Sequence, residues 1–71
     1  MTPEQLINEA KKHLAKVHTT GGGQVCEADF PKVDIQYTAM ISFESDARND
    51  QVSILLERDS GRLVTIMYSP N

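Results

Sequence analysis

The chain has 71 residues, of which 39% are hydrophobic and 24% are charged, a composition typical of one small folded domain. The formal net charge of −3 argues against a general nucleic-acid-binding protein, because contacts to phosphates need clustered Lys and Arg. No apolar run approaches the ~20 residues of a membrane-spanning helix. We therefore expect neither a nucleic-acid partner nor insertion into a membrane.

The first residues lack the features of a secretory signal. Met1 is followed directly by Thr2, Pro3 and Glu4, without a basic segment or an apolar run. The single cysteine, Cys26, cannot form an internal disulfide. These observations predict a cytoplasmic protein whose fold does not depend on disulfides.

A helix is predicted over residues 3–18. Thr2 and Gln5 form a Thr-x-x-Gln capping box around Pro3, which suits the first helical position. Apolar residues then recur at three- and four-residue spacing and form one stripe: Leu6, Ile7, Ala10, Leu14 and Val17. Residues 21–23 are all glycine, and we expect them to end the helix.

Three later segments alternate between apolar and polar residues, the pattern of a strand with one buried face. We predict strands over about 33–44, 51–58 and 62–68. The predicted inward side chains are Val33, Ile35, Tyr37, Ala39, Ile41 and Phe43, then Val52, Ile54 and Leu56, then Val64, Ile66 and Tyr68. Residues 25–30 alternate as well, and whether they form a short additional strand stays open.

The turn between the last two segments predicts their register. Asp59, Ser60 and Gly61 are suited to a tight hairpin, with glycine where a positive φ is usually required. A three-residue loop closed by Arg58 and Arg62 places three apolar pairs on one face: Leu56 with Val64, Ile54 with Ile66 and Val52 with Tyr68. We predict an α+β fold in a single domain over 1–71: one N-terminal helix packed on a three- to four-stranded antiparallel β-meander, αβββ or αββββ.

The residues that most often carry chemistry form no recognisable site. His13 and His18 are five residues apart, a poor match to the i, i+4 spacing that aligns two metal ligands on a helix. Cys26 lacks the surroundings of a nucleophile, and its alternation with Ala28 and Phe30 favours a core-filling role. We therefore expect no enzymatic activity, no catalytic residue, no cofactor and no metal.

The outer face of the predicted sheet is the most informative surface, because one helix can cover only one face. Apolar side chains are expected to gather there with a polar rim beside them: Met40, Leu55, Leu63 and Met67, with Glu57 and Arg62. Such a cluster on a small protein often marks a contact surface, and methionine suits adaptable contacts. The alternative is that intervening Ser and Thr residues dilute these side chains into scattered surface apolar residues.

Charge is distributed unevenly along the chain. Residues 1–20 are mildly basic, whereas the remainder carries eight acids against Lys32, Arg48, Arg58 and Arg62. An acidic sheet side is able to orient a partner or a second copy.

The order of elements resembles a single PepSY-like domain. The residues that carry the resemblance are the opening segments 2–7 and 11–14 and the closing segment 52–64, which is similar to the final hairpin of such domains. The resemblance implies a small non-catalytic module that binds or restrains peptidases, usually outside the cytoplasm. It assigns no functional residue in this chain.

Three functions follow, in order of preference. The first is a non-enzymatic binding or regulatory protein that recognises a protein partner or forms a homodimer through its outer sheet face. The second is an inhibitor from a phage or another mobile element that acts on a host enzyme through an acidic sheet surface. The third is an enzyme or metal protein that uses Cys26 with a histidine such as His13.

Overall fold

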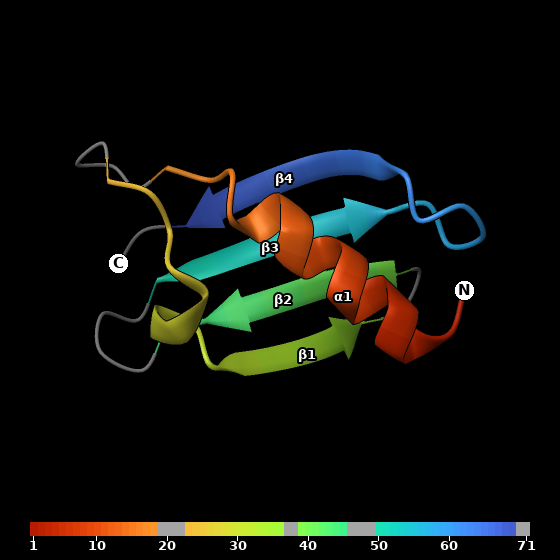
Figure 1. Ribbon diagram of the computed structural model, residues 1–71, viewed down its shortest axis with the longest axis horizontal. Coiled ribbons are helices and arrows are strands. Elements are labelled where there is room, and N and C mark those ends of the chain that lie inside the picture. Colours follow the sequence, from red (N-terminus) through yellow and green to blue (C-terminus); the bar gives the residue numbers. More distant parts are fainter. Residues whose placement is uncertain (19–22, 37–38, 46–49, 70–71) are drawn as a thin grey trace.

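The computed structural model describes residues 1–18, 23–36, 39–45 and 50–69. The helix α1 lies across one face of a four-stranded antiparallel sheet whose strands follow one another in chain order (Figure 1). The elements are α1 (Pro3–Leu14), the short 3-10 helix η1 (Glu27–Asp29), β1 (Lys32–Gln36), β2 (Met40–Glu44), β3 (Gln51–Leu56) and β4 (Leu63–Ser69). The predicted α+β meander is confirmed in its four-stranded form.

The helix begins as its sequence predicts and ends earlier. The Thr2 hydroxyl accepts a hydrogen bond from the Gln5 N–H at 3.1 Å, and the Gln5 side chain accepts one from the Thr2 N–H at 2.8 Å. The predicted end near residue 18 is wrong, because α1 stops at Leu14 and the chain continues in tighter turns. These turns bury Val17, whose carbonyl accepts a hydrogen bond from the Val25 N–H at 2.8 Å.

The glycines expected to end the helix have no part in its end. Gly21 and Gly22 lie outside the described residues, and Gly23 follows them well after Leu14. His18 is therefore in no helical turn; instead it forms an isolated bridge with Gln24.

The segment predicted as one strand over 33–44 is a hairpin. Val33 lies opposite Phe43 and Ile35 opposite Ile41, and Ala39 in the turn has a φ of 61°. The two members of each pair are an even number of positions apart, so both arms turn their apolar side chains to the same face. The alternation of a long strand and that of this hairpin are thus the same. Tyr37 lies outside the described residues.

Residues 25–30 form no strand, and they correct the role expected for Cys26. The segment contains η1, and the Lys11 ammonium lies 3.4 Å from the Glu27 carboxylate, which joins η1 to α1. Phe30 is buried in the core, whereas Cys26 is exposed. The tight 3-10 turn breaks the two-residue alternation, so Cys26 does not fill the core.

The β3–β4 hairpin keeps two of its predicted pairs and shifts the third. Ile54 lies opposite Ile66 and Val52 opposite Tyr68, as predicted, but Leu56 lies opposite Leu63. The reason is a longer loop: the Glu57 N–H donates to the Arg62 carbonyl at 2.7 Å, so the turn spans 58–61. A bulge absorbs the resulting shift, with Val64 as its extra residue.

The bulge reverses the expected environments of two neighbouring residues. Leu63, predicted on the outer face, packs against the core, and Val64, predicted on the inner face, is 60% exposed.

The core lies between α1 and the inner face of the sheet. Its buried apolar residues are Leu6, Ala10, Leu14, Val17, Val25, Phe30, Ala39, Ile41, Phe43, Val52, Ile54 and Leu56. At the end of the sheet away from the β3–β4 turn, buried Asp50 accepts a hydrogen bond of 2.9 Å from the Tyr68 hydroxyl. This bond joins the start of β3 to the end of β4.

The bulge is tested by truncating the two residues it exchanges. Leu63→Ala removes a side chain that packs on the core and is expected to lower the free energy of unfolding by about 1 to 2 kcal/mol. Val64→Ala truncates an exposed side chain and is expected to change it by less than about 0.5 kcal/mol. Urea unfolding of both variants provides the measurement. The reverse ranking would restore the register predicted from a three-residue loop.

Gly61 is a second point at which the turn can be tested. Its φ of 74° is unfavourable for any L side chain, whereas the Met1 sulfur that an added Cβ would meet belongs to a flexible side chain that is able to move away. Gly61→Ala should therefore lower the free energy of unfolding by about 1 to 2 kcal/mol. The matched control is Asp59→Ala in the same turn, where the side chain is exposed. Equal unfolding midpoints for the two variants would contradict the assigned turn geometry.

Candidate protein-binding surface

The face of the sheet turned away from α1, called here the open face, is covered by no described element (Figure 1). Strand register arranges its side chains in three cross-strand rows. The first row is Gln36, Met40, Leu55 and Thr65; the second is Asp34, Ser42, Ser53 and Met67; the third is Lys32, Glu44, Gln51 and Ser69. This surface is where the sequence predicted an interface.

Three of the four predicted apolar interface residues lie together on the open face. Met40 is directly opposite Leu55, and Met67 is in the next row, diagonal to Leu55. Direct partners have Cβ atoms about 5 Å apart, and diagonal partners about 7 to 8 Å, within reach of long side chains. Met40, Leu55 and Met67 therefore form one stripe, named here the apolar stripe.

The fourth predicted residue, Leu63, is not part of the stripe. It packs on the core on the other side of the sheet because the bulge moves it opposite Leu56. Val64, which sequence reasoning placed inside, is the exposed apolar residue at this end of β4. The exchange of Leu63 and Val64 could be found in the sequence only from the turn. There, residues 57–62 are compatible with a loop of three residues or with one of four.

The two predicted rim residues form an ion pair at the end of the hairpin. Arg62 Nη2 lies 3.3 Å from Glu57 Oε2 and donates a hydrogen bond to it, beside the backbone pair that closes the turn. Both side chains are largely exposed, so the pair is worth at most about 1 kcal/mol. Glu57 comes two residues after Leu55, and the alternation of β3 therefore places the pair beside the apolar stripe.

Charged side chains on the open face are few and of both signs. Asp34 and Glu44 carry the carboxylates, and Lys32 is the register partner of Glu44. All three belong to β1 and β2, whereas the apolar stripe extends over β2, β3 and β4. The open face is therefore mixed in charge at one side and uncharged across its middle.

Ser42 lies beside the apolar stripe, and its hydroxyl is buried. The residue is 3% exposed, and its Oγ has no hydrogen-bond partner among the described residues. Ser53 is its register partner on β3. The two short side chains occupy the row beside Met40 and Leu55, and Ser53 is also the register partner of Met67.

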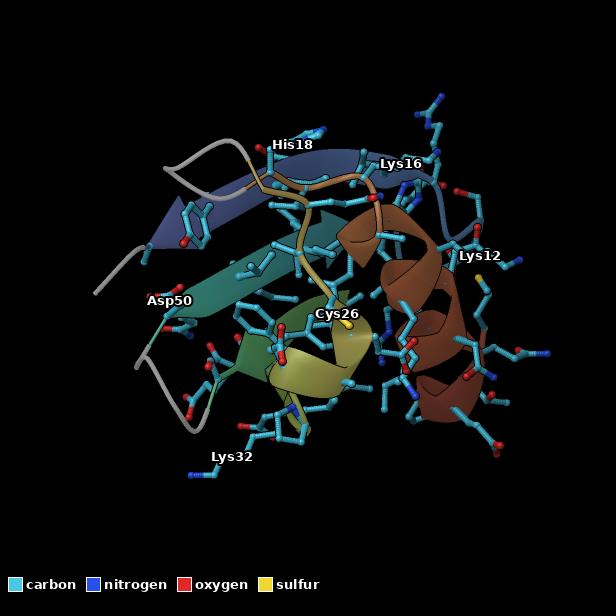
Figure 2. All side chains as sticks on the ribbon, turned by 60° about the vertical axis from the view of Figure 1, so that its left-hand side comes forward. Lys12, Lys16, His18, Cys26, Lys32 and Asp50 are labelled. Carbon is cyan, nitrogen blue, oxygen red and sulfur yellow. The ribbon has the colours of Figure 1, made fainter. Side chains whose placement is uncertain are left out.

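The cysteine and the histidines are spread over different parts of the fold. Figure 2 shows the labelled Cys26 and His18 side chains well apart, with Cys26 next to η1 and His18 beside β4. His13 lies on α1, half-buried, and its Nδ1 has no hydrogen-bond partner in the described part of the chain. Within residues 1–18, 23–36, 39–45 and 50–69, no three His, Cys, Asp or Glu residues are grouped as a metal site would need.

A cavity of about 290 Å³ lies at the N-terminal end of α1. Its lining is mainly apolar, with two polar residues at its border: Met1, Pro3, Leu6, Ile35 and Ala39, with Gln36 and Arg58. Met1 is itself 42% exposed, so one wall of this cavity is a flexible side chain.

Comparison with known proteins adds no relative. No family model matches the chain, and neither a curated protein nor a solved structure is significantly similar to it. The PepSY-like resemblance therefore stays a prediction. In the described residues, no helix is long and apolar enough to cross a membrane.

The stability of a Ser42 variant tests whether the hydroxyl of this residue lacks a hydrogen-bond partner in the free protein. Ser42→Ala removes a buried polar atom that makes no hydrogen bond to any described residue, so the free energy of unfolding should stay the same or rise by up to about 1 kcal/mol. Ser45→Ala, at another buried serine, is the comparison variant. A loss of more than about 1 kcal/mol for Ser42→Ala in urea unfolding would mean that the hydroxyl has a partner.

Proposed function

We propose that this chain is a non-enzymatic binding protein that recognises a flat, apolar surface of a partner protein through its open face. The observation that supports the proposal is the apolar stripe, which strand register holds on the uncovered side of the sheet. Met67 is 46% exposed there, and Met40 and Leu55 are half-buried beside it.

The physical basis is the burial of apolar surface on a rigid support. Each square ångström of apolar surface removed from water contributes roughly 25 cal/mol, and methionine adapts its shape to an irregular partner. The stripe is held by three paired strands, so little backbone order is lost on binding. Glu57 and Arg62 supply a polar rim at one end of the stripe.

The charge pattern favours this function over inhibition through an acidic surface. Asp34 and Glu44 are accompanied by Lys32, and the middle of the open face has no charge. Association through the stripe is therefore expected to persist at high salt, whereas binding led by charge is screened. A peptidase, the partner class that the PepSY-like resemblance implies, is one protein that this surface would serve.

Site-specific photo-crosslinking tests the proposal in the cell, where the partner is present. A photoreactive amino acid is placed at Leu55 in cells of the organism that encodes the chain, and at Asp59 as a control outside the stripe. We expect a defined adduct from position 55 alone. In the same protein, Met67→Lys should lower the adduct yield about tenfold or more, because it buries a charge at the contact.

The charge-matched control is Asn8→Lys on an exposed position of α1, which should leave the adduct unchanged. The yield should also be similar in roughly 0.05 and 0.5 M salt. Equal adducts from positions 55 and 59, or an adduct insensitive to Met67→Lys, would contradict recognition through the stripe.

A further inference from the structure

The two edges of the sheet differ in how they are protected. Strand β1 forms one edge and carries Lys32 and Asp34, and charges on an edge strand discourage another strand from pairing with it. Strand β4 forms the other edge, and its sequence from Leu63 to Ser69 contains no Asp, Glu, Lys, Arg or His. No described strand pairs with β4 on the side away from β3.

We propose that two copies of the chain pair antiparallel along β4, about a two-fold axis at Ile66, and join their four-stranded sheets into one. The occupant of the unprotected edge is thus a second copy. The pairing of identical edges by two-fold symmetry makes one closed contact, as in most homodimers.

The sequence of β4 is compatible with pairing to itself. An axis at Ile66 places Thr65 of one copy opposite Met67 of the other, and Ile66 opposite its own counterpart. No like charges meet, and β-branched residues or methionine occupy the central positions. Because Thr65 and Met67 both belong to the open face, the two open faces lie on the same side of the joined sheet.

The helix leaves this edge accessible. The main contacts of α1 with the sheet are made with β1, β2 and β3. The segment after the helix runs beside β4 on the inner side, where Figure 2 places Lys16 and His18. The contact between copies is therefore made by the backbone edge, with Thr65 and Met67 on the open face and Ile66 on the inner face.

The area of the open face gives a further reason to expect such pairing, and this reason rests on the proposed function. Four strands about 4.8 Å apart, with about five residues each, provide a flat area of roughly 330 Å². A standard protein–protein interface buries about 800 Å² on each partner. Joining two copies doubles the available area and brings it close to that size.

The test is the solution mass, measured by light scattering over a concentration series up to about 1 mM. The natural sequence should show two copies per particle. The double variant Thr65→Lys with Met67→Lys places like charges opposite each other in two cross-strand pairs and should weaken the dimer about tenfold or more.

The matched control is Thr65→Glu with Met67→Lys, which changes the same exposed positions but places opposite charges across the axis. It should restore the dimer. Overall charge repulsion predicts the opposite ranking, because the two-lysine variant has a net charge closer to zero than the −3 of the natural chain. Far-UV circular dichroism and thermal unfolding verify that both variants are folded.

A third variant separates this proposal from the proposed function. Leu55→Lys alters the apolar stripe on β3 without changing the β4 edge, so it should leave the dimer intact while it reduces crosslinking to a partner. A monomer at every concentration, equal behaviour of the two double variants, or dissociation by Leu55→Lys would each overturn pairing through β4.

Discussion

The structure depends on one helix covering one face of a sheet. Leu6, Ala10 and Leu14 of α1 are buried against the sheet, which turns its own apolar residues toward them. A chain of 71 residues has no second helix of comparable length among its described residues to cover the opposite face. The register that places Ile41 and Ile54 in the core therefore also places Met40 and Leu55 on the outside. Core and candidate surface are two results of the same alternation.

The same alternation explains what the sequence could predict. A capping box states where a helix begins, and Thr2 and Gln5 do so without ambiguity. The end of α1 has no such signal, because Val17 continues the helical spacing of apolar residues although it reaches the core from a non-helical turn. The hairpin of β1 and β2 escaped prediction because the pairing keeps the apolar residues of both strands on the inner face, so the alternation along the sequence is that of one long strand.

The residues of the candidate site could be predicted only where the strand register could be predicted. Met40 and Leu55 lie together on the open face as predicted, because β2 and β3 pair without an irregularity. The assignment of Leu63 failed for a reason outside the strands themselves: one additional residue in the turn needs one additional residue in the bulge. The core position predicted for Cys26 failed for a related reason. The 3-10 helix after it is only three residues long, too short to leave a mark on the apparent two-residue alternation of the sequence.

The charged edge strand β1 has a consequence for how far any assembly of this protein can extend. If β4 edges join, both outer edges of the product are copies of β1, with Lys32 and Asp34 on each. Strand addition then has no unprotected template left, so growth ends at a finite particle instead of continuing into a fibre. Replacing Lys32 and Asp34 with uncharged residues would leave both outer edges open to pairing, and the sheet would then become a repeating unit of a longer assembly.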